Sequence, residues 1–188
     1  PSYRRLVEAL KGRKRAAAIL ICVVLLVVLL VPWYLIAQEV SQEALRTIML
    51  TNDYIATFHS QMATFATIFM GIIDIDSGAL TYINAGHEEA YIVGQSGIRH
   101  ALPPTGPVVG IFAGAGYSIA SAVLEPGETI LLYTDGVPEA TNESGDQFSD
   151  QRLRSMLESW QGGADELLQM IVNSVSDFAV GAAQHDDI

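Results

Sequence analysis

Residues 130–137 read ILLYTDGV, an apolar run rich in β-formers that ends on Asp135 and Gly136. Such a run is typical of a buried strand, and a glycine beside the carboxylate lets the backbone turn or approach another segment closely. A carboxylate at the end of a buried strand is a candidate metal ligand. Asp-Gly after a strand is more often a simple turn, so Asp135 has two explanations at this point.

A second acidic feature stands at Asp186 and Asp187, after the last predicted helix. Adjacent like charges repel unless water or a cation surrounds them, so this pair is either a solvated segment or part of a cation site. His185 adjoins the pair and could ligate a metal, but a solvated loop histidine explains it equally well.

Outward from these residues, strand and turn signals predict a β-hairpin made of residues 65–75 and 80–84, with Asp76-Ser77-Gly78 as its turn. Further strands are predicted over 90–93, 117–124 and 129–134, with a turn at 125–128 between the last two. A helix with an inward apolar face is predicted from residue 44 to about 59–61. Two more helices follow, the first capped by Ser149 and broken at Gly162-Gly163, the second apolar at Leu167, Leu168, Ile171, Val172, Val175 and Phe178. Strands in a run followed by helices favour an α+β fold over a doubly wound one.

The N-terminal part of the chain reads as a membrane anchor. Residues 16–37 contain no charge, and a 22-residue helix covers the roughly 30 Å of bilayer hydrocarbon. Trp33 and Tyr34, near the C-terminal end of this segment, are residues that favour the membrane–water interface. The basic residues 1–15 precede the segment and predict a cytoplasmic N-terminus. A cleaved signal peptide is the alternative, but the apolar run is long and no small-x-small site follows it. Residues 38–46 are predicted to be a linker or junction, and residues 47–188 a folded domain.

Charge and cysteine content exclude several classes of protein. The 188 residues carry a formal net charge of −11, but six of the ten basic residues fall in the first 15 positions, so that segment has +5 and the remainder −16. Phosphate binding needs clustered cations, so we expect no nucleic acid partner for the folded domain. The single cysteine, Cys22, cannot form an intrachain disulfide.

Five segments follow one another in an informative order. They are MATFATIF (62–69), LTYINAGH (80–87), LPPTG (102–106), YTDGVPEA (133–140) and DDI (186–188). In this order and spacing they resemble the SpoIIE-type (RsbU-like) branch of the PPM metal-dependent serine/threonine protein phosphatases. The resemblance covers residues from about 47 to 188.

The resemblance implies an αββα sandwich with two Mn²⁺ or Mg²⁺ ions at one end of the sheets, where a bridging water attacks a phosphoserine or phosphothreonine protein. Bacterial members often act on an anti-anti-sigma factor.

Asp135 and Asp186 match metal-binding aspartates of the family. The resemblance also places Gly136, Asp187, His87, Asn84 and Thr105 around the metal ligands or in a loop that meets the substrate. His87 is also a candidate general acid, although a turn stabilised by Asn84 and Gly86 explains that segment as well. A second copy of this chain, in a homodimer, is a further candidate partner.

One departure from the family is serious. Its early Asp-x-x-Gly-x-Gly motif, which supplies a metal-bridging aspartate ahead of the helix at residue 44, has no counterpart in this chain. Asp74 and Asp76 are poor substitutes because turn chemistry explains them fully. We therefore expect a membrane-anchored phosphatase that is shortened here, whose intact form has more chain between about 38 and 47 and keeps its domain in the cytoplasm. A non-catalytic, phosphatase-like binding module and a plain membrane-tethered structural domain are the competing classes.

Overall fold

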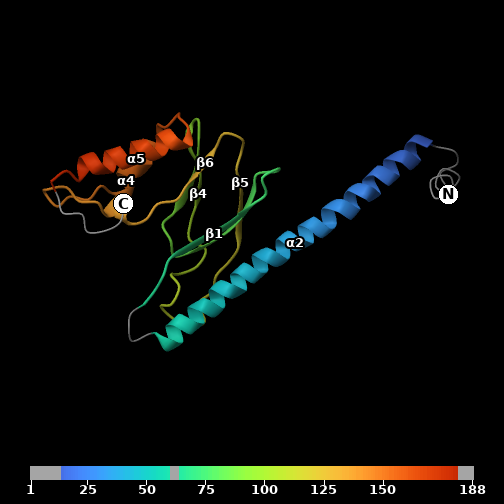
Figure 1. Ribbon diagram of the computed structural model, residues 1–188, viewed down its shortest axis with the longest axis horizontal. Helices are drawn as coiled ribbons and strands as arrows, with labels where there is room; N and C mark the ends of the chain where they lie inside the picture. Colours follow the sequence, from blue (N-terminus) through green and yellow to red (C-terminus); the bar gives the residue numbers. More distant parts are fainter. Residues whose placement is uncertain (1–13, 60–63, 182–188) are drawn as a thin grey trace. The chain divides into compact units, whose positions relative to one another are not determined.

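The computed structural model describes residues 14–59 and 64–181 (Figure 1). The chain divides into two compact units, with the division between Ala44 and Leu45. The elements, in order, are α2 (Lys14–Phe58), β1 (Ile68–Ile73), β2 (Ala79–Ala85), β3 (Ala90–Gly94), β4 (Gly97–Leu102), β5 (Ala120–Val123), β6 (Thr129–Leu131), α3 (Gly136–Glu139), α4 (Asp150–Glu158) and α5 (Ala164–Phe178).

Helix α2 contains the predicted membrane segment and continues well beyond it. It is a single 45-residue helix with Pro32 inside it. Residues 38–46, which the sequence predicts to be a linker or junction, are helical and continue α2 without a break. That stretch is polar, but it contains no glycine or proline and is rich in good helix formers such as Glu, Gln and Ala. By length and composition, this is the one described helix that could cross a membrane.

The second unit contains two antiparallel three-stranded sheets, in the orders β1-β2-β5 and β4-β3-β6. The predicted hairpin is confirmed as β1 and β2, which pair from Ile68 opposite Ala85 to Ile73 opposite Leu80. Its turn depends on Asp74, whose Oδ1 accepts hydrogen bonds from the Asp76 and Ser77 backbone N–H groups at 3.1 and 2.9 Å. This is the turn chemistry that the sequence predicts for these acids.

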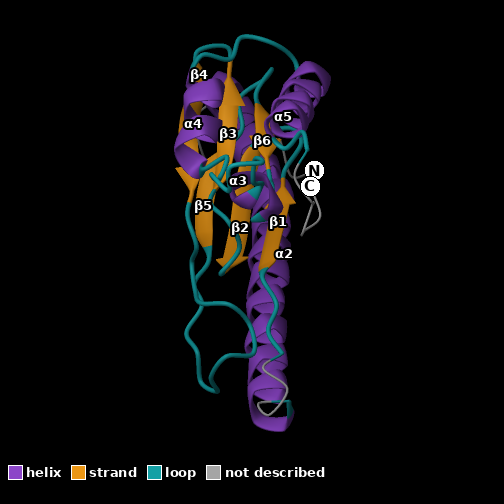
Figure 2. Ribbon diagram, turned by 90° about the vertical axis from the view of Figure 1, so that its left-hand side faces the viewer, coloured by secondary structure: helices purple, strands orange, loops and turns teal. Residues whose placement is uncertain are grey.

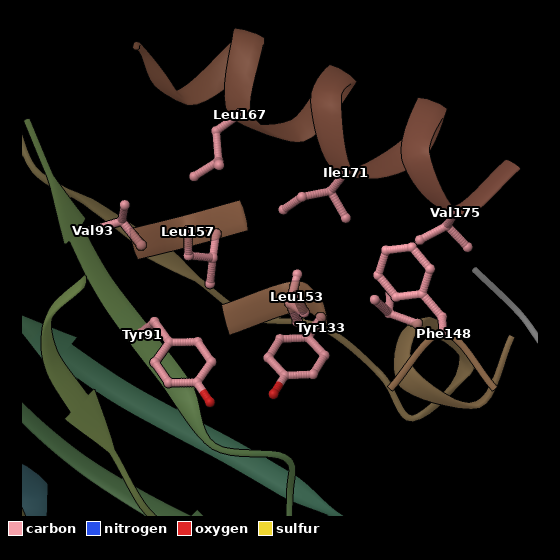
Figure 3. Close-up of a cluster of buried hydrophobic side chains, with 10 residues drawn as sticks. Tyr91, Val93, Tyr133, Phe148, Leu153, Leu157, Leu167, Ile171 and Val175 are labelled. Atoms are coloured by element: carbon pink, nitrogen blue, oxygen red, sulfur yellow. The ribbon is translucent and has the colours of Figure 1, made fainter. Parts of the chain in front are cut away.

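The two sheets pack face to face, with α4 and α5 against the second one (Figure 2). Leu80 and Tyr82 of β2 meet Ile92 of β3 and Leu102 of β4 in the layer between the sheets. The opposite face of β3 packs against the helices in a second cluster, shown in Figure 3, that includes Tyr91, Val93, Leu153, Leu157, Leu167, Ile171 and Val175. This mixed α+β arrangement agrees with the predicted class.

Several local expectations differ from the structure. Strand β4 was not predicted, because residues 97–102 mix polar and apolar side chains without clear alternation. Ser149 precedes α4 as expected, but it has φ 72° and its side chain makes no capping hydrogen bond. In α5, Leu168 and Val172 are exposed because only one face of the helix packs inward, the face of Leu167, Ile171 and Val175.

The last turns of α2 are tied to the loop between β4 and β5 through Asn52, which is fully buried. Its Oδ1 accepts hydrogen bonds from the Gly110 N–H at 2.9 Å and the Tyr117 hydroxyl at 3.1 Å. Its Nδ2 donates to the Phe112 carbonyl at 3.0 Å. A buried amide costs free energy unless its hydrogen bonds are made, so this residue fixes the loop to the helix.

Candidate functional site

The candidate site is built around the turn that follows β2. Asn84 is fully buried, and its Oδ1 accepts the backbone N–H of His87 at 2.8 Å. Its Nδ2 donates to the carbonyls of Glu88 and Leu102, at 3.2 and 3.4 Å. The amide therefore holds the turn closed and attaches it to β4.

Gly86 makes this turn sterically possible. It has φ 70°, a conformation that residues with a Cβ rarely adopt, and a Cβ placed on it would lie 2.6 Å from Val108 Cα. Glycine is thus required twice, for its backbone angle and for the close approach of the neighbouring segment.

Thr105 ties the proline-containing loop to the same turn. Its N–H donates to the Asn84 carbonyl at 2.7 Å, and its Oγ1 accepts the Asn84 N–H at 3.0 Å. Ala85 and Gly106 form an isolated parallel bridge beside this contact. The structure brings together three residues that the sequence singled out, Asn84, His87 and Thr105.

The strand pairing places this turn beside Asp135. Tyr91 of β3 lies opposite Leu131 of β6, and the rings of Tyr91 and Tyr133 stack with centroids 6.1 Å apart. Because the two segments are antiparallel, residues before Tyr91 run alongside residues after Leu131. Asp135 then occupies the N-cap position of the short helix α3, and its side chain is exposed.

Several carboxylates gather where these segments meet. Burial is the main cause that raises the pKa of Glu88, and the negative charges of Asp150 and Asp135 raise it further. Burial also raises the pKa of Tyr133, so that its hydroxyl stays protonated, and this hydroxyl lies 3.5 Å from Asp150 Oδ1. In Figure 3 the hydroxyls of Tyr91 and Tyr133 point away from α5, out of the apolar cluster.

The sequence analysis missed Glu88, Tyr133 and Asp150 as members of this region. Glu88 had a signal, since it directly follows His87 in the segment already singled out. Asp150 had none, because an acid in the first turn of a helix is ordinary. Gly136 is buried as the first residue of α3. Asp186, Asp187 and His185 lie outside the described residues, so their predicted roles stay predictions.

Comparison with known proteins identifies the family. The family model "Stage II sporulation protein E (SpoIIE)" matches residues 36–188, which is most of the chain. The chain belongs to the SpoIIE family. The chain is 42% identical to Protein IcfG of Synechocystis over 151 residues, which cover 80% of this chain and 24% of that protein. It is 30% identical over 127 residues to the phosphoserine phosphatase RsbU of Bacillus subtilis, covering 65% of this chain and 37% of RsbU. The chain thus spans well under half the length of these SpoIIE-family relatives.

Solved structures show the same fold. The SiaA-PP2C domain of Pseudomonas aeruginosa aligns with a TM-score of 0.60 at 22% identity, covering 72% of this chain and 54% of that one. The RsbU and RsbW domains of Rv1364c from Mycobacterium tuberculosis align with a TM-score of 0.54 at 25% identity, covering 70% and 37%. The PP2C-type fold expected from the sequence is confirmed. One of the SpoIIE structures that align, from Bacillus subtilis, was presoaked with Mn.

The chemistry of the described residues suits a hard divalent cation but does not complete a site. Carboxylate oxygens are the ligands that Mn²⁺ and Mg²⁺ prefer, and Asp135 offers one beside Glu88 and Asp150. Within residues 14–59 and 64–181, however, no three His, Cys, Asp or Glu side chains are arranged so that they could hold a metal ion.

Proposed function

We propose that residues 47–188 are the C-terminal part of a metal-dependent phosphatase domain that removes phosphate from a phosphoserine or phosphothreonine protein in a bacterial signalling pathway, such as an anti-anti-sigma factor. The observation that carries the proposal is the meeting of the Asn84–Glu88 turn with Asp135. These two segments of the family pattern are about 50 residues apart in the sequence. The antiparallel β3–β6 pair brings them side by side, because one segment precedes β3 and the other follows β6.

Asp135 and Asp186 would hold the metal, with Asp187 beside them. Mn²⁺ or Mg²⁺ bound there supplies a Lewis acid and an activated water. The chain's own residues fix the shape of the site. Asn84 and Thr105 hold the turn, Gly136 is buried at the start of α3, and His87 stands on the turn next to the acids.

A non-catalytic binding module is the second candidate, and one observation favours it. The chain has no Asp-x-x-Gly-x-Gly segment, so the aspartate that bridges two ions in the family is absent. Retention of Asp135 beside other carboxylates argues the other way, because crowded carboxylates are costly without a cation.

Phosphate release separates these two candidates. We expect the chain with Mn²⁺ to release phosphate slowly from a phosphoserine protein or para-nitrophenyl phosphate, and Asp135→Asn to abolish that release because it removes a ligand charge. Asp76→Asn is the matched control, since Asp76 is an exposed acid of the β1–β2 turn. Release that does not depend on Mn²⁺, or that is equal in Asp135→Asn and the unmodified chain, would refute the phosphatase proposal.

The proposed location is the membrane, with the folded domain in the cytoplasm of the intact protein. The apolar segment of α2 is expected to keep the chain in the membrane fraction during carbonate washing, because transfer of about 20 apolar residues out of lipid is very unfavourable. Immunoblotting of the washed pellet and of the supernatant measures this. A soluble product that begins near Gln38 would show a cleaved signal peptide and no anchor.

A further inference from the structure

The imidazole of His87 contacts a residue outside its own turn. Thr67 Oγ1 lies 3.1 Å from His87 Nδ1, although the two residues are 20 positions apart. Thr67 stands directly before β1, while His87 stands on the turn after β2. With its backbone N–H bonded to Asn84 Oδ1, His87 is fixed at its main chain and at one ring nitrogen.

Because Nδ1 is held by Thr67, Nε2 is the ring nitrogen that can donate a proton to a substrate. The turn lies alongside residues 133–135 through the β3–β6 register, and the adjacent Glu88 lies within the electrostatic influence of Asp135. A histidine in that place can give a proton to the oxygen that leaves phosphorus, provided that Nε2 carries the proton and Nδ1 is held by an acceptor.

We propose that Thr67 is a positioning residue for His87. The Thr67 hydroxyl accepts the Nδ1–H of the ring in both charge states, so that Nε2 is the nitrogen that gains and loses the proton. Both nitrogens of an imidazolium are donors, so the hydroxyl must accept from Nδ1 when the ring is charged, and in this arrangement it does so in both charge states without rotating. Water can satisfy the hydroxyl hydrogen, since Thr67 is exposed.

This inference rests on the proposed function, because it assigns His87 as the proton donor of that reaction. Water bonds to phosphorus, the bond between phosphorus and the serine or threonine oxygen breaks, and the departing oxygen keeps the electron pair and takes the Nε2 proton. The ring is left neutral with its proton on Nδ1, facing Thr67, and Nε2 regains a proton that the attacking water gives up through solvent. The products are the free hydroxyl side chain and inorganic phosphate.

The test is the tautomer of neutral His87, read from ¹⁵N signals of the ring in the full 188-residue chain in detergent micelles. His87→Gln assigns the signal among the four histidines of the chain. At a pH above the histidine titration range, we expect a pyrrole-type Nδ1 and a pyridine-type Nε2 in the unmodified chain and in Thr67→Ser. Thr67→Val should lose this pattern and change to the Nε2–H tautomer, because valine offers no acceptor.

A structural role for Thr67 alone would leave the tautomer unchanged. Thr64→Val controls for an exposed threonine nearby, and the signals of His100, on β4, report that the fold is kept. If Thr67→Val does not fold, Thr67→Ala makes the same comparison. An Nε2–H tautomer in the unmodified chain, or the same tautomer in Thr67→Val and the unmodified chain, would overturn the proposal. The measurement needs neither metal nor turnover, so its failure is distinct from failure of the phosphatase proposal.

Discussion

The 188-residue chain is expected to release phosphate on the order of a hundredfold more slowly than a version that carries an intact family member's Asp-x-x-Gly-x-Gly segment ahead of residue 44. Two ions about 3.5 to 4 Å apart need a ligand that bridges them, and this chain lacks the residue that the family uses. With Asp135 and Asp186 alone, the cation should bind loosely and the attacking water should be poorly aimed. The proposed metal site thus predicts a large rate difference from one missing segment.

The assay uses both versions on the same phosphoserine protein and on para-nitrophenyl phosphate, with Mn²⁺ present. An extended version whose inserted aspartate is replaced by asparagine controls for the extra chain itself. Equal turnover in the unmodified and extended chains would show that the bridging aspartate is dispensable, and this account of the site would then be wrong.

Gly86→Ala is expected to destabilise the folded domain by about 2–5 kcal/mol. The left-handed conformation costs a residue with a Cβ about 1–2 kcal/mol, and overpacking typically adds about 1–3 kcal/mol. The added carbon would meet the Val108 backbone N and Cα as well as its Cγ1, so the neighbour cannot relax by rotating a side chain. The free energy of unfolding, measured from urea denaturation in detergent, tests this expectation.

Gly127→Ala is the matched control. Gly127 also has a left-handed φ, 85°, but a Cβ there would meet nothing within 4 Å. We expect it to cost only the conformational part, about 1–2 kcal/mol. If the two substitutions cost the same, close packing of the Asn84–Glu88 turn against Val108 is not a constraint on the site.

The sequence predicts the local elements whose signals are local. The β1–β2 hairpin was predictable because Asp74, Asp76 and Ser77 form their own turn and the flanking strands are rich in β-formers. The strand before Asp135 was predictable from its apolar run, but β6 ends at Leu131 instead of Thr134 and is only partly buried, and Leu132 is exposed. Both signals lie within a dozen residues, where propensity and hydrogen bonding act together.

Features that depend on partners far along the chain were not predictable in the same way. Asn52 looks like an ordinary polar residue of a helix, yet it is buried because Gly110, Phe112 and Tyr117 of the β4–β5 loop, about 60 residues later in the chain, pack and bond against it. Its position on the apolar face, between Ile48 and Ile55, was the available signal. The contact between Thr67 and His87 had no signal, since a pair of side chains 20 residues apart meets only through the fold.

The central claim is that Asp135 and Asp186 converge on one cation, and thermal unfolding with and without millimolar Mn²⁺ tests it most directly. Binding to the folded state at ten times the dissociation constant stabilises by about 1.4 kcal/mol, which corresponds to a rise in Tm of a few degrees. We predict this rise for the unmodified chain and for Asp76→Asn, and its loss in both Asp135→Asn and Asp186→Asn. A transition that Mn²⁺ leaves unchanged, or a rise that survives either substitution at the site, would contradict convergence.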